Sequence, residues 1–392
     1  MKTDSLATRH SKRRYVIVIK NVVFLYSHFL DLALAVQSSG WEVHIIAARN
    51  ADVSRLQKLG LVFHEVHSGR SPWNVLVDAI RSIQTQRIIR SINPDCIHII
   101  YLKNVLIDGF FSRSHPAPVI AAITGLGSLF AEEKLLYRVA RPVVMRMLRL
   151  AFRSRNCILA VENADDRALM ISCGVITNDR SKVIPGAGIK RTRISPVSTK
   201  PKDVVILCAA RMIRPKGIRE LISAARLLKA RNLQFEVWIS GGCEIGHPEA
   251  ISEEELRSAE SEGTIKWLGY RTDIPELLSQ ASIVCLPTYY REGLPRALVE
   301  GAAAGLPIVT TDMPGCRDVV ISERNGFLVC PRDPIELGVA LERLICSQEL
   351  RCKMGRESRR RFDEMLSLDS VFGAFNGCYE ALGIDLKVKV EN

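Results

Sequence analysis

The sequence predicts an α/β protein made of two doubly wound domains that face each other across a cleft. Short apolar runs rich in β-branched residues alternate with helical patterns along the chain, which is typical of parallel sheets. This alternation breaks once, in a Pro-, Lys-, Ser- and Thr-rich stretch from Pro185 to Lys202, and then starts again. A chain of 392 residues is long enough to bury one core in each of two such domains.

The first domain is expected to span residues 1–190. A β-branched strand at Tyr15 to Lys20 is followed by an Ala- and Leu-rich helix at Phe29 to Ser38, which Gly40 terminates. Further strands of the same sheet are expected at residues 41–47, 96–100, 119–123 and 157–161.

Residues 191–203 are the expected linker, and residues 204–365 the second domain. Its strands are expected at residues 204–209, 235–240, 264–268, 281–286 and 308–311, with helices at 217–230 and after Pro295. Residues 366–392 contain a helical stretch, Val371 to Leu382, that is expected to cross back onto the first domain. Because ligands of parallel sheets bind outside the carboxyl ends of the strands, the site is expected between the domains.

The composition disfavours several classes of protein. The chain is 47% hydrophobic and 24% charged. It contains no run of 18 uncharged apolar residues, so no transmembrane helix is predicted. Residues Met1 to Arg14 lack the apolar core of a signal peptide. Eleven cysteines without a Cys-x-x-Cys pair indicate the reduced thiols of a cytoplasmic protein, not a disulfide framework or a zinc site.

Positive charge is concentrated in the first half of the chain. The net charge is +12, and residues 1–200 hold 29 Lys and Arg against 14 Asp and Glu, whereas residues 201–392 hold 25 against 28. The first half is therefore expected to meet an anionic partner.

The segment Lys134 to Arg155 accounts for much of this asymmetry, because it contains seven Lys and Arg and no acid. On a helical wheel its cations fall on one half: Lys134, Arg138, Arg141, Arg146, Arg149, Arg153 and Arg155. The other half collects the apolar residues Leu136, Val139, Ala140, Val143, Met147, Leu150 and Ala151. Such a segment suits an anionic bilayer surface, with a solvated basic helix as the alternative, and Pro142 predicts a kink or two helices. Nucleic acid is disfavoured, because aromatic residues do not alternate with the cations.

The candidate site is organised around residues 288–302, where an apolar strand is followed by a Gly293-Leu294-Pro295 turn and a helix-forming run. A strand, a sharp loop and a helix N-terminus commonly form an anion site. Two acids of this segment, Glu292 and Glu300, lie eight residues apart and are expected near the same crevice.

Two further loops of the second domain carry candidate ligands. Arg211 and Lys216 follow a strand and are expected to clamp a diphosphate, Arg as a two-pronged donor and Lys as a point charge. The alternative is a solvated basic loop. In the loop from Gly269 to Pro275, Asp273 is the expected N-cap of the next helix. Its role is either this local one or to hold a base against the backbone near Gly269 and Arg271.

Together these motifs resemble those of glycosyltransferase family 4, whose members are retaining, metal-independent enzymes of the GT-B fold with two Rossmann-like domains. The resemblance rests on Arg211 to Gly217, Trp267 to Gly269, Glu292 to Pro295 with Glu300, Thr310 to Arg317, and Asn325 to Val329. The stretches Tyr289 to Gly293 and Ile123 to Gly127 also resemble the branch that adds N-acetylhexosamine to undecaprenyl-diphosphate-linked acceptors in N-glycan, O-antigen and capsule assembly.

The resemblance implies a role for each candidate. Arg211 and Lys216 hold the donor diphosphate, Glu292 lies at the donor sugar hydroxyls beside the Gly293 and Leu294 amides, and Glu300 binds the ribose of UDP. Glu292, Arg211 and Lys216 are the expected catalytic set. Cations and a helix N-terminus stabilise the charge that develops on departing UDP, so no metal or other cofactor is expected.

The acceptor is expected to contact the first domain. The resemblance points to Lys103, to Thr124 and Gly125, which allow close backbone approach, and to His28, which either orients substrate or begins a helix without a ligand. Relatives carry a cation shortly after that histidine, where this chain has Phe29 and Leu30.

The predicted function is retaining transfer of an N-acetylhexosamine or hexose from a UDP-sugar to a lipid-diphosphate-linked saccharide. The protein is expected in the cytoplasm, peripheral on the inner face of the membrane. Alternatives are a nucleotide-sugar epimerase of the same fold and a non-catalytic nucleotide-sugar-binding assembly protein. A glycosidase pair of Glu292 and Glu300 is disfavoured, because it gives Arg211 and Lys216 no role.

Overall fold

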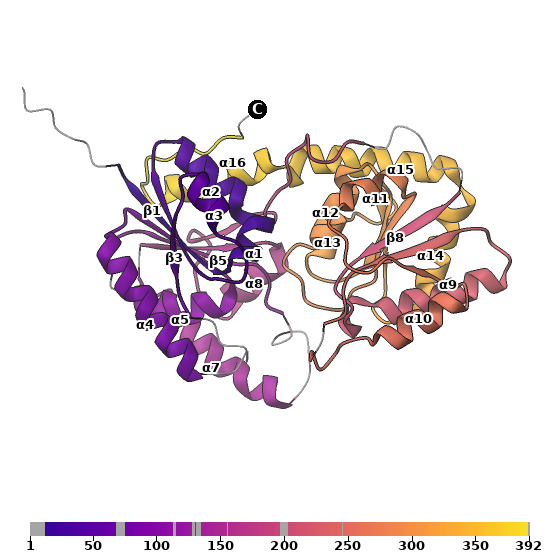
Figure 1. The fold of residues 1–392 in the computed structure, drawn as a ribbon, viewed down its shortest axis with the longest axis horizontal. Coiled ribbons are helices and arrows are strands. Elements are labelled where there is room, and N and C mark those ends of the chain that lie inside the picture. The colour runs from indigo at the N-terminus through magenta and orange to yellow at the C-terminus, as the bar shows by residue number, and fades with distance from the viewer. Residues whose placement is uncertain are drawn as a thin grey trace, which may run out of the picture.

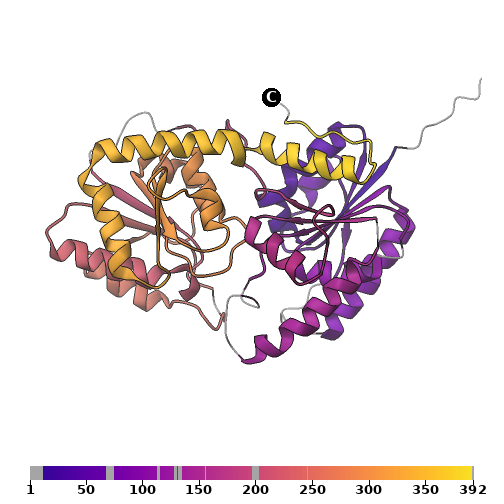
Figure 2. The ribbon, with the colours of Figure 1, turned by 180° about the vertical axis from the view of Figure 1, so that it is seen from behind.

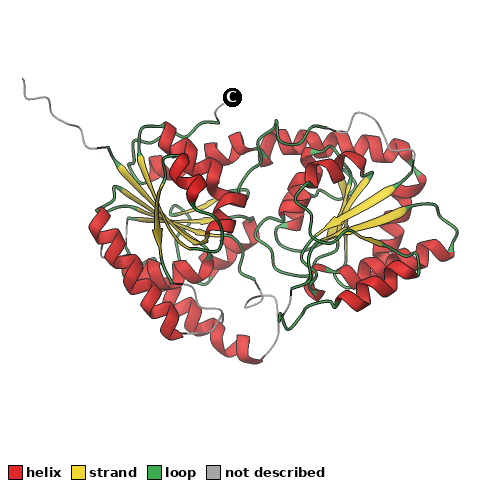
Figure 3. Ribbon diagram, viewed as in Figure 1, coloured by secondary structure: helices red, strands yellow, loops and turns green. Residues whose placement is uncertain are grey.

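The computed structural model describes residues 12–67, 75–112, 115–127, 130, 135–154, 156–196, 203–244 and 246–390. Two parallel sheets form two lobes, and helices cover each sheet (Figures 1 and 3). This arrangement confirms the predicted fold class of two doubly wound α/β domains.

The first sheet has seven strands in the order β3-β2-β1-β4-β5-β6-β7. Their bounds are β1 Arg14–Asn21, β2 Glu42–Ala48, β3 Val62–Glu65, β4 Cys96–Ile100, β5 Val119–Ile123, β6 Cys157–Val161 and β7 Ser181–Val183. The bounds of β4, β5 and β6 coincide with the predicted ones, because these strands are buried along their whole length and have continuous apolar sequences. The two edge strands, β3 and β7, are partly exposed and were not predicted.

The helices of the first domain are α1 Val22–Phe24, α2 Leu30–Ser38, α3 Ser54–Lys58, α4 Val75–Ile92, α5 Leu102–Ser112, α7 Leu135–Ala151 and α8 Ala164–Ser172. A π-helical turn, η1 Leu25–Phe29, joins α1 to α2. The helix predicted at Phe29 therefore begins earlier, where the side chain of Asn21 accepts a hydrogen bond from the Phe24 amide at 2.9 Å. The β-branched and aromatic residues of α1 and η1 concealed the helix start in the sequence.

The second sheet has six strands in the order β10-β9-β8-β11-β12-β13. They are β8 Val205–Ala209, β9 Glu236–Ser240, β10 Lys266–Trp267, β11 Ile283–Leu286, β12 Ile308–Thr311 and β13 Gly326–Val329. The surrounding helices are the 3₁₀ turn η2 Arg214–Lys216, α9 Ile218–Ala230, α10 Glu253–Ser261, α11 Ile274–Gln280, α12 Arg296–Ala303, α13 Cys316–Val319, α14 Pro334–Cys346 and α15 Gln348–Arg361.

After α15 the chain returns to the first domain through a π-helical turn, η3 Phe362–Leu366, and the helix α16 Leu368–Ala381 (Figures 1 and 2). Phe372, Phe375 and Tyr379 of α16 are buried in the core on one face of the first sheet. The hydroxyl of Tyr379 lies 3.0 Å from that of Tyr15 on β1. The end of the chain is therefore part of the first hydrophobic core.

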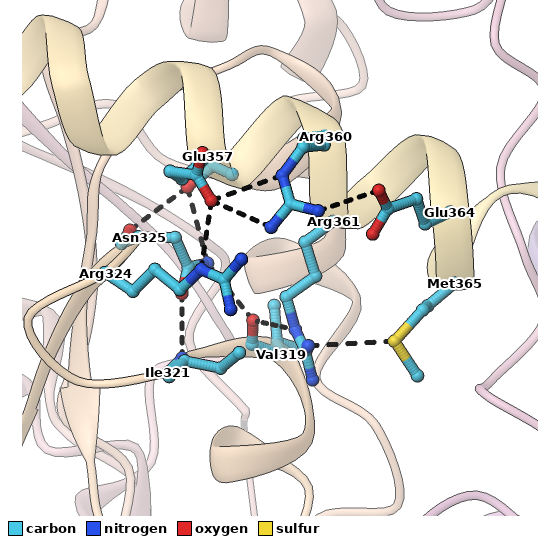
Figure 4. A network of polar contacts seen from close by, with 10 residues as sticks. Val319, Ile321, Arg324, Asn325, Glu357, Arg360, Arg361, Glu364 and Met365 are labelled. Carbon is cyan, nitrogen blue, oxygen red and sulfur yellow. Dashed lines mark hydrogen bonds and ion pairs between the residues drawn. The ribbon is translucent and has the colours of Figure 1, made fainter.

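The charged end of α15 is fixed to the second domain by a polar network (Figure 4). Glu357 pairs with Arg324 at 3.1 Å and with Arg360 at 2.9 Å, and Arg360 also pairs with Glu364 at 2.8 Å. The guanidinium of Arg361 donates to the carbonyl of Val319 at the end of α13. This network holds the last turn of α15 in place before the chain crosses to the first domain.

Candidate active site

Loops of the two domains meet where the strands of both sheets end. The amide of Leu294 donates to Oε2 of Glu162 at 2.9 Å, and Nδ2 of Asn163 donates to the carbonyl of Gly293 at 2.9 Å. Glu162 and Asn163 follow β6 in the first domain, whereas residues 291–294, here called the donor loop, follow β11 in the second. The donor loop is thus held by the opposite domain.

Two glycines permit this close approach. A Cβ at Gly125 would lie 2.6 Å from the amide nitrogen of Gly293, and the φ of Gly125 is +113°. A Cβ at Gly293 would collide with the Glu162 carboxylate and the Thr124 backbone. Any side chain at either position would push the two domains apart. The structure therefore places Thr124 and Gly125 against the donor loop.

Lys216 and Glu292 are brought together as a partly buried ion pair. The Nζ of Lys216 donates to Oε1 of Glu292, and the side chains are only 12% and 15% exposed. Oγ1 of Thr288 lies 3.4 Å from the same carboxylate oxygen, and the Lys216 ammonium lies 5.7 Å from the centroid of the Tyr290 ring. Arg211 is separate from this pair, exposed and 4.0 Å from Glu244.

Glu300 forms an ion pair that the sequence interpretation missed. Its carboxylate accepts from Nε of Arg296, one helical turn earlier on α12, at 2.8 Å. Arg296 also donates to the carbonyl of Ser27 in the first domain. The spacing of four residues between Arg296 and Glu300 was the signal that could have identified this pair.

His28 adjoins the Arg296 contact, with Nδ1 2.6 Å from Oγ of Ser27. Burial and the nearby Arg296 cation lower the pKa of His28 to about 4, so its imidazole is neutral at neutral pH. The residue lies in the π-helical turn η1 and is half-buried. A neutral imidazole beside Arg296 can accept or donate a hydrogen bond but cannot supply a positive charge to an acceptor phosphate.

A second ion pair between the domains joins Arg291 of the donor loop to Asp166 of α8. Both Nε and NH2 of Arg291 lie 2.8 Å from Oδ1 of Asp166, whose side chain is fully buried. Burial raises the pKa of Asp166, and the Arg291 charge opposes that rise. These residues are 125 positions apart, so no local pattern in the sequence predicts their contact.

Glu162 is the most perturbed acid of the site. Burial raises its pKa to about 8, the charges of Asp166 and Glu292 act in the same direction, and the Leu294 amide opposes them. Nothing in the sequence distinguished this acid from others that follow strands.

Replacing Glu162 by glutamine is expected to make stability less dependent on pH. The folded-state pKa of Glu162 is raised from an ordinary 4.5 to about 8, so the wild type loses stability relative to the variant as pH rises from 5 to 8. Urea unfolding of both proteins at each pH measures the difference. Parallel stability curves for the two proteins over this range would contradict the assignment.

The predicted base-binding loop is arranged differently from the expectation. Asp273 occupies the N-cap position of α11, but its side chain makes no capping hydrogen bond. Its carboxylate instead pairs with Arg271, whose Nε lies 2.8 Å from Oδ1. Gly269, with a φ of +65°, accepts the Gly241 amide through its carbonyl at 2.8 Å. The Asp273 carboxylate therefore holds the guanidinium of Arg271, two residues after Gly269.

Lys103, which was predicted to contact the acceptor, forms an ion pair with Asp78 of α4 at 2.7 Å. Lys103 is the second residue of α5 and so lies just beyond the carboxyl end of β4. Its charge is therefore balanced locally.

The basic segment of the first domain forms α7, which runs along one side of that domain (Figure 1). The helix continues through Pro142, so of the two predicted alternatives, a kink or two helices, the second is wrong. Met145 and Leu148 face the core, whereas Val139 and Val143 are 65% and 60% exposed and Met147 is also exposed. Of its cations, Arg138, Arg146 and Arg149 are exposed and Arg141 is half-buried, and Arg149 donates to the carbonyl of Cys173. Lys134 and Arg155 lie outside the described residues.

The described parts of the chain contain neither a candidate metal cluster nor a helix that could span a membrane. No group of three or more His, Cys, Asp or Glu side chains there is placed to hold a metal ion. No helix of those parts combines the length and the apolar character needed to cross a bilayer.

Family models match both domains. The model "Glycosyl transferase 4-like" matches residues 20–162, and "Glycosyl transferases group 1" matches residues 190–361. The N,N'-diacetylbacillosaminyl-diphospho-undecaprenol alpha-1,3-N-acetylgalactosaminyltransferase of Campylobacter jejuni is 24% identical, over 87% of this chain and 92% of its own length. The capsular polysaccharide biosynthesis glycosyltransferase CapM of Staphylococcus aureus is 23% identical over 45% of this chain and 46% of its own.

Solved structures share the fold. Sucrose-phosphate synthase from Thermosynechococcus elongatus has a TM-score of 0.79 at 16% identity, covering 95% of this chain and 99% of its own. Anabaena HepE in complex with UDP has a TM-score of 0.74 at 16% identity, covering 94% of this chain and 100% of its own.

Proposed function

The chain is a group 1 glycosyltransferase of the GT-B fold, and from this premise we propose that it transfers an N-acetylhexosamine or hexose from a UDP-sugar to a lipid-diphosphate-linked saccharide. Transfer retains the anomeric configuration and contributes to the assembly of a surface polysaccharide or glycan. The similarity to an enzyme named for a diphospho-undecaprenol-linked substrate and to one named for capsular polysaccharide biosynthesis supports this proposal.

The observation that carries the proposal is the ion pair of Lys216 and Glu292 beside the donor loop. An ammonium and a carboxylate held together away from water are each poised for a different part of a UDP-sugar. When the donor binds, its diphosphate takes the Lys216 ammonium, and Glu292 becomes free to accept hydrogen bonds from sugar hydroxyls. Without the donor, the ammonium and the carboxylate neutralise each other in the ion pair, and binding of the donor separates them.

The positive groups around the site also stabilise UDP as the leaving group. Cleavage of the glycosidic bond places negative charge on UDP, which Lys216, Arg211 and the N-terminus of α12 stabilise. We expect no metal requirement, because these groups supply the positive charge themselves. Attack from the same face as UDP departure gives retention, with Glu292 as a sugar ligand and not a nucleophile. In this proposal Glu300, which is paired with Arg296, binds the ribose.

The proposal is tested by incubating the protein with UDP-GalNAc, UDP-GlcNAc, UDP-Gal and UDP-Glc, each with and without EDTA. One donor is expected to raise the thermal midpoint and to be hydrolysed slowly to UDP, and EDTA is expected to change neither result. Isomerisation of the sugar without an acceptor would instead identify an epimerase. Binding without hydrolysis, and without transfer to lipid-linked saccharides, would identify a non-catalytic binding protein.

We further propose that α7 docks the protein on the anionic inner face of the cytoplasmic membrane. Its exposed apolar stripe, Val139, Val143 and Met147, lies beside the cations Arg138 and Arg146, so the helix offers both hydrophobic contact and charge attraction. This surface would bring the interdomain site to a lipid-linked acceptor.

Neutralising the cations of α7 is expected to release the protein from anionic vesicles. Each cation near such a surface contributes roughly 1 kcal/mol, so changing four of them to glutamine should weaken binding by about two to three orders of magnitude. The variant carries these substitutions at Arg138, Arg141, Arg146 and Arg149. Flotation with phosphatidylglycerol vesicles measures the effect, and unchanged flotation would contradict it. The matched control carries glutamine at four exposed second-domain arginines, Arg226, Arg231, Arg257 and Arg324.

A further inference from the structure

An arginine that contacts no substrate in the proposed function joins the nucleotide side of the site to the first domain. Arg296 is the first residue of α12, and its Nε donates to Oε1 of Glu300 at 2.8 Å. Its Nη1 donates to the carbonyl of Ser27 in the first domain. One guanidinium therefore holds the carboxylate of Glu300 and is itself held by the opposite domain.

The stability of α12 does not account for this arginine. A cation at the first position of a helix opposes the helix dipole, and the first turn of α12 contains no acid that would offset it. An arginine four residues before a glutamate is also the less favourable order for such a pair on a helix. Arg296 is therefore better explained by the two groups that it holds than by the helix that carries it.

The anchor of Arg296 in the first domain is itself fixed. Ser27 lies in η1, and its Oγ donates to the carbonyl of Val23 at 2.9 Å and lies 2.6 Å from Nδ1 of His28. π-Helical turns of this kind are frequent at functional sites. The side chains of Arg296 and Glu300 are 24% and 13% exposed, so the solvent screens their ion pair only in part. The guanidinium is thus fixed at both of its contacts.

The second oxygen of the Glu300 carboxylate is left for a ligand. Oε1 is taken by Arg296, whereas among the residues that the structure describes no hydrogen bond or ion pair reaches Oε2. A carboxylate accepts hydrogen bonds and does not donate them, so a fixed and partly exposed oxygen of this kind suits a hydroxyl group. The guanidinium also balances the negative charge of Glu300, which favours a neutral donor such as a ribose hydroxyl over a cation.

We propose that Arg296 is a positioning residue that holds the carboxylate of Glu300 for the ribose hydroxyls of UDP, so that the site selects a ribonucleotide over the 2′-deoxyribonucleotide. This inference rests on the proposed function, which assigns the ribose to Glu300. Arg296 touches no part of the donor and acts through Glu300 alone. Because Arg296 is anchored on Ser27, the ribose contact is complete only while the first domain lies against α12.

The test compares the affinities of UDP and 2′-deoxy-UDP by calorimetry, because these nucleotides differ in one ribose hydroxyl. The wild type is expected to bind UDP roughly 10- to 100-fold more tightly, the usual effect of one hydrogen bond to a charged group. Arg296→Met should reduce this preference to within about threefold by weakening UDP alone, and so should Glu300→Ala. Arg296→Lys keeps the charge without the two-pronged guanidinium and should retain an intermediate preference. Arg360→Met is the control, because Arg360 also pairs with a glutamate four residues later but lies on α15, and it should keep the wild-type preference.

Two results would overturn the inference alone. If Arg296→Met keeps the full preference for UDP while Glu300→Ala loses it, Glu300 does not need Arg296. If Arg296→Met weakens UDP and 2′-deoxy-UDP equally, Arg296 acts on the fold or on the diphosphate and not through Glu300. Should Arg296→Met not fold, Arg296→Lys decides, because a full wild-type preference in that variant would also overturn the inference. A wild type that binds no UDP, or binds both nucleotides equally, would overturn the proposed role of Glu300 together with the inference.

Discussion

Replacing Glu292 by alanine should lower the rate of sugar transfer by about 100- to 1,000-fold, the usual cost of removing one polar contact made in the transition state. UDP binding should be preserved or tighter, because Lys216 then no longer has to leave its ion pair to reach the diphosphate. Lys216→Ala should have the opposite effect on the nucleotide and weaken UDP binding. Transfer assays with a radiolabelled donor and calorimetry with UDP measure the two effects separately.

A matched control is available on α11, where Glu276 is exposed. Glu276→Ala should leave both transfer and UDP affinity unchanged. Undiminished turnover of Glu292→Ala would reject its assigned role at the donor sugar. A large loss of UDP affinity in that variant would reject the idea that Lys216 is shared between Glu292 and the diphosphate.

Replacing Arg291 by methionine should destabilise the protein by about 3–5 kcal/mol, because the fully buried carboxylate of Asp166 then loses its partner. This corresponds to a fall in the thermal midpoint of roughly 10 °C. The loss should grow as pH rises, since without Arg291 the buried Asp166 has a raised pKa and is stable only when protonated. Thermal unfolding at pH 5 and pH 8 provides the measurement.

The double variant Arg291→Met with Asp166→Asn is the control, because it removes the buried charge along with its partner. It should recover much of the lost stability, and most of the pH dependence of that loss should disappear. If the double variant is as unstable as Arg291→Met, the loss comes from packing of the arginine side chain and not from the unpaired carboxylate.

The sequence predicted those elements whose signal is local. The strands β4, β5 and β6 are continuous apolar runs, and their burial makes the sequence and the structure agree to the residue. Edge strands such as β7 are partly exposed to solvent and contain too few apolar residues to be recognised in the sequence. The helix start at Asn21 was hidden by β-branched and aromatic residues, whose helix propensity is low.

The site shows the same division between local and distant signals. The donor loop, Lys216 and Glu300 were located because each lies in a recognisable loop or helix start. The contacts of Glu162 and Arg291 join residues more than 100 positions apart, and only the folded chain brings them together.

The return of the chain to the first domain has a mechanical consequence. The two domains are joined by two covalent crossings, and these lie side by side: the Leu368 amide donates to Ile189 at 3.0 Å, and a Cβ at Gly188 would lie 2.8 Å from the Leu368 Cα. We expect paired crossings of this kind to act as a hinge that lets the domains swing and limits their twisting. Opening about such a hinge would part the donor loop from Glu162 and Asp166, and closing would restore these contacts.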